Sequence, residues 1–253
     1  MTVKTLYESL SERIPASLSL EWDHDGLAVC PDLSAPVRKV LCVLDVTDYA
    51  ITYAKENGFD VILAHHPMFM RGLGAVTEET FLGRRALACV SAGISVMTFH
   101  TRADAVEGGV NDCLLRALGL QPQPMPCENN LLRFGRLAEA QSVSCFARTV
   151  KEALGAECVR YCDSGKSVSL VAVCGGGGKD FAHVAKASGA DLYLTGELNH
   201  HILTDGKDDE MSYMDAGHFE TEYPVLAFFA EQVKDICPQA EVECLRLTPF
   251  ETI

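Results

Sequence analysis

Two adjacent histidines, His65 and His66, end the apolar run Val61–Ala64 and are followed by Pro67. Imidazole is the commonest side-chain ligand of transition metals, so a strand that delivers two of them to one point could serve one metal centre. Pro67 biases the residue before it toward extended backbone and cannot continue a sheet ladder, which ends the strand at the pair. The positions of the other histidines and carboxylates decide whether a metal site is predicted.

Four further apolar runs also carry polar residues just after their ends. They are followed by His100 and Asp104, by Gly175–Gly178, by Glu197 with His200 and His201, and by His218 with Glu222. In open α/β sheets, ligands bind at the carboxyl ends of the strands, because the loops there face one crevice. The pattern predicts one polar site that is assembled from distant parts of the sequence.

His218 and Glu222 are four residues apart at the predicted start of a helix, so both side chains share one helix face. The alternative is a capping histidine beside a solvated glutamate. His100 and Asp104 repeat this separation, and there the alternative is a loop aspartate that caps the following helix. Structural zinc sites are closed by four ligands, usually including cysteine, whereas histidines mixed with a shared carboxylate fit two ions. Asp104 and Glu222 are the candidates for the bridging carboxylate.

Two features allow two interpretations each. Gly175–Gly178 could hold a phosphate through its backbone N–H groups, although it lacks the lysine-serine ending of a P-loop, or it could form a tight turn. His200 and His201 could line the same crevice or form a surface pair. His183 lies within a predicted helix, and we interpret it as structural.

Strands and helices alternate along the chain, which predicts an α/β fold with largely parallel sheets. The predicted helices cover residues 4–13, 48–57, 78–92, 110–118, 142–154, 179–188 and 223–232, and the main predicted strands cover residues 39–46, 60–64, 168–174, 191–195 and 241–247. Prolines at alternate positions of the segment 121–126 exclude a helix or a central strand and indicate a boundary. We therefore expect two interleaved lobes, residues 1–121 plus 216–253 and residues 122–215, with the dinuclear metal crevice at strand C-terminal ends.

The chain is acidic, with 21 Lys and Arg against 35 Asp and Glu in 253 residues and a net charge of −14. This charge repels phosphate backbones and anionic membranes, so direct nucleic-acid binding and membrane association are not expected. The 11 cysteines are odd in number and fit no disulfide framework. We find no signal-peptide or membrane-length apolar segment. A reduced, cytoplasmic, soluble protein is expected.

Six motifs in order resemble those of the NIF-three-like dinuclear metal centre family, whose members are often named GTP cyclohydrolase I type 2 homologues. The motifs are Trp22–Leu27, His65–Pro67, His100–Asp104, Gly108–Asp112, Thr195–His201 and Asp215–Glu222. The chain departs from the family pattern at His24, where the family has asparagine, and at Arg102-Ala103, where it has asparagine-leucine. We expect Arg102 to add positive charge beside the site and to change which anion binds.

The resemblance implies that metal is bound by His65, His66, Asp104, His218 and Glu222. It also suggests His100 as a proton-transfer group, and we predict His100 and His201 as catalytic residues. Two divalent ions per chain are expected, and histidine with carboxylate suits zinc, iron, manganese or nickel. The family also implies a ring-shaped homohexamer.

The predicted function is that of a metal-dependent hydrolase resembling GTP cyclohydrolase I type 2 homologues and acting on a small-molecule substrate. Two ions would lower the pKa of a bridging water and make a nucleophile available at neutral pH. The alternative is a non-catalytic metal-handling or regulatory scaffold protein. The ligand set favours the hydrolase, because five ligands shared by two ions leave coordination positions for water or substrate.

Overall fold

The computed structural model describes residues 1–71, 73–125, 130–248 and 250, and these divide into two compact units. Unit 1 comprises Met1–Val106 and the described residues from Leu226 on, and unit 2 comprises Glu107–Val225. The expected boundaries lie after residues 121 and 215, whereas the packing places residues 107–121 and 216–225 in unit 2. His218 and Glu222 therefore belong to unit 2.

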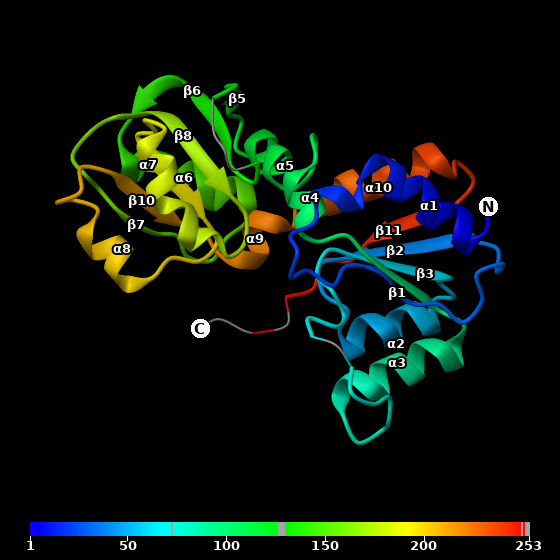
Figure 1. Cartoon of the computed structure of the whole chain (residues 1–253). Coiled ribbons are helices and arrows are strands. Elements are labelled where there is room, and N and C mark those ends of the chain that lie inside the picture. Colours follow the sequence, from blue (N-terminus) through cyan, green and yellow to red (C-terminus); the bar gives the residue numbers. More distant parts are fainter. Residues whose placement is uncertain (72, 126–129, 249, 251–253) are drawn as a thin grey trace. The chain divides into compact units, whose positions relative to one another are not determined.

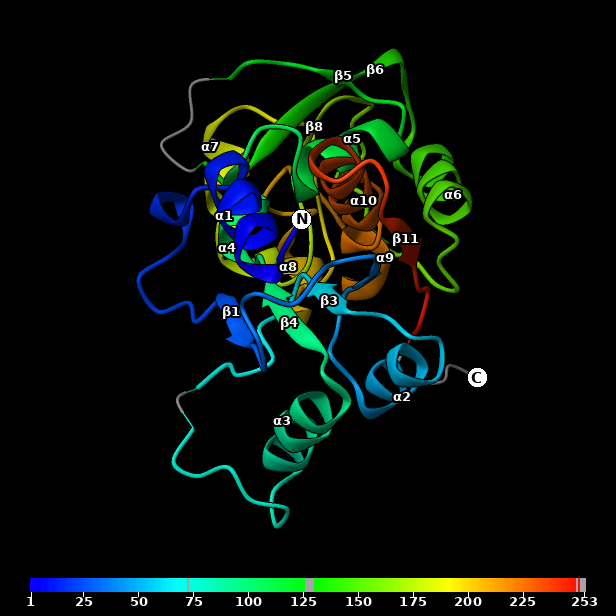
Figure 2. The same ribbon diagram turned by 90° about the vertical axis from the view of Figure 1, so that its right-hand side faces the viewer.

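Unit 1 contains a sheet of five strands with helices on both faces (Figure 1). The strand order is β1 (Gly26–Val29), β4 (Ser95–Thr98), β3 (Val61–Ala64), β2 (Lys39–Val43) and β11 (Glu241–Cys244). All neighbours are parallel except β1, which is antiparallel to β4. Helices α1 (Val3–Arg13) and α10 (Val225–Ile236) lie on one face, and α2 (Asp48–Glu56) and α3 (Phe81–Ala92) lie on the other (Figure 2).

Local sequence signals set the helix ends of unit 1. Thr2, Thr47 and Thr80 each accept a hydrogen bond from a backbone N–H of the first turn of α1, α2 and α3, which satisfies a donor that would otherwise lack a partner. Gly93 ends α3 with φ +71°, a conformation that glycine adopts without strain. The short helices η1 (Ala16–Leu18) and α4 (Thr101–Ala105) complete the unit.

Unit 2 contains a mixed sheet of six strands. The strand order is β5 (Gln121–Pro122), β6 (Arg133–Gln141), β8 (Val168–Cys174), β9 (Leu192–Thr195), β10 (Ser212–Asp215) and β7 (Arg160–Cys162). The three strands β8, β9 and β10 are parallel, and the other pairings are antiparallel. Its helices are α5 (Val110–Ala117), α6 (Val143–Leu154), η2 (Gly178–Phe181), α7 (Ala182–Ala187), α8 (His200–Asp205) and α9 (His218–Glu222). The mixed α/β class predicted from the sequence is confirmed.

Helices α5 and α6 share the core of unit 2 with the parallel strands, through Leu114, Phe146 and Val171 among others. This packing holds α5 and the segment that follows it in unit 2. Pro122 lies in the edge strand β5, where a missing N–H is tolerated, and Pro126 lies outside the described residues. Across the described part of the chain, none of the helices combines the length and apolarity that crossing a bilayer requires.

Candidate metal centre

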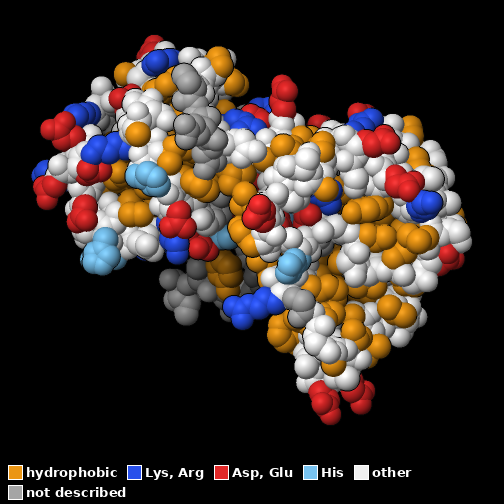
Figure 3. Space-filling view, viewed as in Figure 1, with side chains coloured by type: hydrophobic (Ala, Val, Ile, Leu, Met, Phe, Trp, Pro, Cys, Tyr) orange, Lys and Arg blue, Asp and Glu red, His pale blue; other side chains and the backbone are white. Residues whose placement is uncertain are grey.

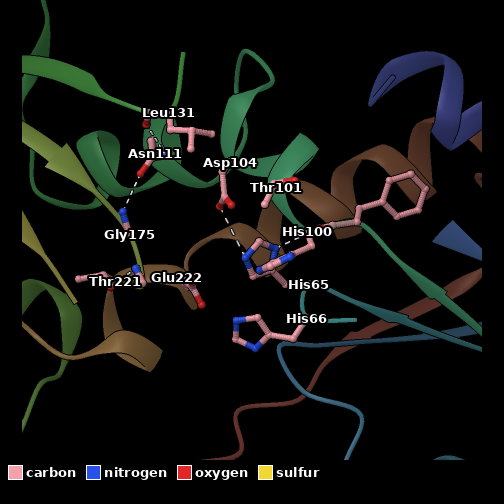
Figure 4. A network of polar contacts seen from close by, with 12 residues as sticks. His65, His66, His100, Thr101, Asp104, Asn111, Leu131, Gly175, Thr221 and Glu222 are labelled. Atoms are coloured by element: carbon pink, nitrogen blue, oxygen red, sulfur yellow. Dashed lines mark hydrogen bonds and ion pairs between the residues drawn. The ribbon is translucent and has the colours of Figure 1, made fainter. Parts of the chain in front are cut away.

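The carboxyl ends of the parallel strands of unit 1 bring three histidines together (Figure 4). His65 and His66 directly follow β3, and His100 follows its neighbour β4 after a single intervening residue. Ligand-capable nitrogens of the three rings lie within 4.8 Å of one another. The ring centroids are 4.9 to 5.6 Å apart. Within unit 1 the structure brings these three predicted residues together.

Each of these rings is held at Nδ1 by an oxygen acceptor. Nδ1 of His65 donates to the carbonyl oxygen of Phe99 (3.0 Å), and Nδ1 of His66 donates to Oδ1 of Asp45 (2.9 Å). Nδ1 of His100 donates to Oδ1 of Asp23 (3.0 Å). Because the proton is on Nδ1, the ring lone pair is on Nε2. Metal-binding histidines in proteins are oriented in this way.

Asp104 joins the histidines from helix α4. Its Oδ1 lies 3.6 Å from Nε2 of His65, and its side chain is 17% exposed. In the tautomer set by Phe99 both atoms are acceptors, so a positive charge shared by them would stabilise the pair. The alternative was a loop aspartate that caps the next helix, but Asp104 lies within helix α4 (Thr101–Ala105), and α5 has no side-chain cap hydrogen bond.

A short segment before β1 fixes His100. The Asp23 carboxylate is fully buried and also accepts hydrogen bonds from the N–H and the hydroxyl of Thr101. Burial alone would raise the pKa of Asp23, but the hydrogen bonds from His100 and Thr101 outweigh it and hold this pKa well below 3.8. Asp25 accepts from the backbone N–H of His100 (3.0 Å). Asp23 therefore stays ionised and orients the imidazole.

Arg102 does not add charge to the site, and this expectation was wrong. Its side chain is 1% exposed and donates from Nε to Asp25 (2.8 Å) and from Nη1 to the carbonyl of Ile14 (3.2 Å). The guanidinium also lies 4.1 Å from the centroid of Phe99. A buried arginine needs such a partner for its charge, so Arg102 and Asp25 neutralise each other in the core of unit 1.

Unit 2 holds a second group on α9 and the β9 end. Nδ1 of His218 donates to Oε1 of Glu197 (2.7 Å), and Nε2 of His218 lies 3.1 Å from Oε2 of Glu222. The i, i+4 pair therefore shares one helix face as predicted, and Glu222 is buried at 4% exposure. With the proton on Nδ1, two acceptors again face each other. A cation bound by both residues would relieve their repulsion.

The glycine run after β8 packs closely against α9. A Cβ on Gly176 would collide with Oε1 of Glu222, and its φ of +63° disfavours any side chain. A Cβ on Gly196, after β9, would fall 2.6 Å from the Cα of His218. These glycines let the helix that carries His218 and Glu222 approach the strand ends.

The same run is occupied by protein contacts and does not offer a phosphate cradle. Gly175 N–H donates to Asn111 (2.7 Å; Figure 4), and Gly176 N–H donates to Thr221 (3.0 Å). Gly178 N–H donates to Thr195 (3.0 Å). Three of the four N–H groups that a phosphate would need are therefore engaged, which favours the tight-turn interpretation.

The other histidines lie elsewhere on unit 2. His201 is exposed on α8 and lines an open cleft of about 940 Å³ between α7 and α8, together with His183. The residues that line this cleft include neither His218 nor Glu222. His200 is also exposed and contacts the ring of His201 at 5.9 Å.

Sequence reasoning missed the three carboxylates that orient the histidines. Asp45 carries the same signal as the predicted ligands, since it follows the end of a parallel strand, but the strand was predicted to run to residue 46. Asp23 and Glu197 lie within two of the motifs, where their side chains had no assigned partner. Each of them accepts a hydrogen bond from Nδ1 of one histidine, and within unit 1 the rings of His65, His66 and His100 form a group that could hold a metal ion.

Known proteins have sequences similar to that of this chain. A protein of Clostridium perfringens named GTP cyclohydrolase 1 type 2 homolog is 33% identical over 242 residues, which cover 93% of this chain and 92% of that protein. A NIF3 homolog of Schizosaccharomyces pombe is 31% identical and covers 81% of this chain and 79% of its own length.

Solved structures agree on the fold. A Staphylococcus aureus protein described as hypothetical superposes with a TM-score of 0.91 at 22% identity, covering 100% of this chain and 99% of its own. Reduced HcgD from Methanocaldococcus jannaschii gives a TM-score of 0.83 at 26% identity, covering 98% of each chain. Residues 1–249 match the Duf34/NIF3 (NGG1p interacting factor 3) family, and the chain belongs to it.

Proposed function

We propose that the two groups of side chains form one dinuclear metal site, held by His65, His66, Asp104, His218 and Glu222. The observation that carries the proposal is that the three proposed histidine ligands each donate from Nδ1 to an oxygen acceptor. This is the orientation that a metal ligand needs. Asp104 and Glu222 are the proposed bridging carboxylates, because each lies against Nε2 of a histidine in its own unit.

The reaction class that this donor set suits best is metal-dependent hydrolysis. Divalent ions would supply Lewis acidity and lower the pKa of a water ligand. We assign proton transfer to His100, whose ring lies 5.2 Å from that of His65 while Asp23 holds its Nδ1. His201 remains a second predicted catalytic residue. Because His201 is exposed on α8, we expect its substitution to lower turnover less than substitution of His100 does.

The names of the relatives suggest a substrate class. Several are named GTP cyclohydrolase 1 type 2 homologs, which suggests a nucleotide or a cyclic amide as substrate. The second candidate is a metal-handling or regulatory scaffold protein. The family description favours the scaffold function, because it names an interacting factor and no reaction.

A substrate screen at verified metal occupancy separates these functions. Nucleotides, phosphoesters and cyclic amides would be tested with the metal-loaded protein. We expect His65→Ala to abolish turnover together with metal binding, and His100→Ala to lower turnover about 10²- to 10⁴-fold at unchanged metal content. His183→Ala, in α7, is the matched control. Full occupancy without turnover of any substrate would support the scaffold function instead.

We further propose that the chain assembles as a homohexamer. Exposed apolar side chains on α2 and α3 support self-association, since Tyr49, Phe81 and Val90 are each more than half exposed. Figure 3 shows hydrophobic side chains gathered over the part of unit 1 that these helices occupy in Figure 1. Light scattering should give a mass near six chains of 27.5 kDa, and a clean monomer would refute this assembly.

A further inference from the structure

An exposed indole lies beside His100. Trp22 is 56% exposed, and its ring meets the imidazole of His100 edge-on at 5.9 Å between centroids. It is the single tryptophan of the chain. Leaving so large an apolar surface in water costs free energy that burial would recover, so its position beside a candidate catalytic group calls for an explanation.

The backbone around Trp22 is fastened on both sides. The N–H of Leu20 donates to the hydroxyl of Thr101 (3.0 Å), and the N–H of Asp23 donates to the carbonyl of Leu20 (2.9 Å). The buried Asp23 carboxylate then binds His100 and Thr101. The hydrogen bonds that orient His100 therefore also fix Asp23, the residue next to Trp22, and hold the backbone that carries the indole beside His100.

The neighbours of Trp22 in the chain are polar. Glu21 and His24 are exposed on either side of it, so the indole is not the centre of a continuous apolar stretch of sequence. A flat aromatic face among hydrogen-bonding groups suits a ligand that is itself flat and polar at its edges. Heteroaromatic rings such as nucleobases have this character, and every base offers a π-face for stacking.

We propose that Trp22 is a stacking platform for a planar heteroaromatic ring of the substrate, which it holds beside His100. The proposal rests on the proposed function, in which His100 transfers a proton. It narrows the substrate class to molecules that carry such a ring, and it gives the first of the six motifs two tasks. Asp23 orients the imidazole, and Trp22 binds the ring.

Fluorescence of the single tryptophan tests this directly. The probes are guanosine, adenosine, uridine and biopterin, and ribose 5-phosphate is the control without a ring. We expect at least one ring compound to quench Trp22 saturably, whereas ribose 5-phosphate does not. By calorimetry, Trp22→Ala should weaken binding of that compound roughly 5- to 150-fold, and Trp22→Phe should retain most of the affinity. Metal content and the thermal midpoint should not change, since the side chain is exposed.

Three results would overturn the proposal. They are quenching by none of the ring compounds, unchanged affinity in Trp22→Ala, and an indole that acrylamide does not reach in the ligand-free protein because a second copy covers it. Failure of the proposed function looks different. Ring binding that depends on Trp22 without any turnover would refute the hydrolase and keep the platform, while turnover with an unchanged KM in Trp22→Ala would refute the platform and keep the hydrolase.

Discussion

The two units position their candidate metal ligands in different ways. Each gathers its candidate ligands, or the residues that orient and accommodate them, near the carboxyl ends of parallel strands, β2, β3 and β4 in unit 1 and β8, β9 and β10 in unit 2. In unit 1 the histidines directly follow the strand ends or come one residue later, and hydrogen bonds from Nδ1 to oxygen acceptors fix them. In unit 2 the ligands lie on the helix α9, and glycines at the strand ends let this helix come close.

This difference indicates where each half is sensitive to substitution. Unit 1 depends on hydrogen-bonded side chains, so removing a charge or an acceptor should disturb it. Unit 2 depends on missing side chains, so adding a single carbon should disturb it. A polar motif and a glycine run can therefore both belong to a metal centre, although only the polar motif supplies ligands.

The largest effect is expected for Gly176→Ala in unit 2. The added Cβ collides with Glu222 at a φ of +63°, and we expect a loss of about 3 kcal/mol in unfolding free energy together with weaker metal binding. Gly58→Ala in unit 1 is the matched control, because Gly58 has φ +69° and nothing within 4 Å. It should cost only about 1 kcal/mol. Equal losses in urea unfolding would show that α9 does not need the glycine.

The next effect concerns the carboxylates that orient the histidines. Asp45→Asn in unit 1 and Glu197→Gln in unit 2 should each weaken metal binding about 10- to 100-fold, since partners of ligands contribute that much. Glu197 should have the smaller effect, because its side chain is 58% exposed against 39% for Asp45. Titration with a chelator measures both, with the exposed Asp208→Asn as control. If Asp45→Asn binds metal as tightly as Asp208→Asn does, Asp45 does not contribute to metal binding by orienting His66.

A pH-dependent effect is expected for Asp23. Its pKa is lower in the folded than in the unfolded chain, so the ionised carboxylate stabilises the fold above about pH 4, and this contribution is lost as the pH falls toward the folded pKa. Asp23→Asn should therefore cost about 1–2 kcal/mol at pH 7 and progressively less below pH 4. Urea unfolding between pH 7 and pH 3 checks this. A difference that is constant over that range would contradict the assignment.

The smallest effect compares thiols on one helix of each unit. Cys89 in α3 is fully buried, and burial raises its pKa to about 11, whereas Cys145 in α6 is exposed. Iodoacetamide at pH 8 should modify Cys145 in the native protein and Cys89 only after unfolding. The modification of Cys145 should not change the free energy of unfolding. Peptide mapping by mass spectrometry resolves the two sites, and fast labelling of native Cys89 would show that α3 opens readily.

The sequence predicted the parts of the fold that have strong local signals. Strand Val168–Cys174 and helix Val143–Leu154 agree with the predicted ranges within one residue, because continuous apolar runs, serine caps and glycine ends mark them. The antiparallel strands β1, β6 and β7 were missed. The burial pattern of β6 becomes mostly exposed after its first residues, which leaves little apolar periodicity to detect.

The candidate ligands were found because their types and positions repeat after each strand. The orienting residues were not, because a hydrogen bond between Asp23 and His100 joins positions 77 residues apart and leaves no local pattern. The ion pair of Arg102 was missed for the same reason, since only the fold shows that Asp25 neutralises the charge of Arg102.

The central claim is that both units contribute ligands to one site with two metal ions. Elemental analysis of the purified protein after dialysis against each candidate metal tests it most directly, with Asp104→Ala from unit 1 and Glu222→Ala from unit 2 measured beside the wild type. We predict two ions per chain in the wild type and the loss of both in either variant, because each variant removes a bridging carboxylate. A single tightly held ion that Glu222→Ala does not disturb would contradict the claim.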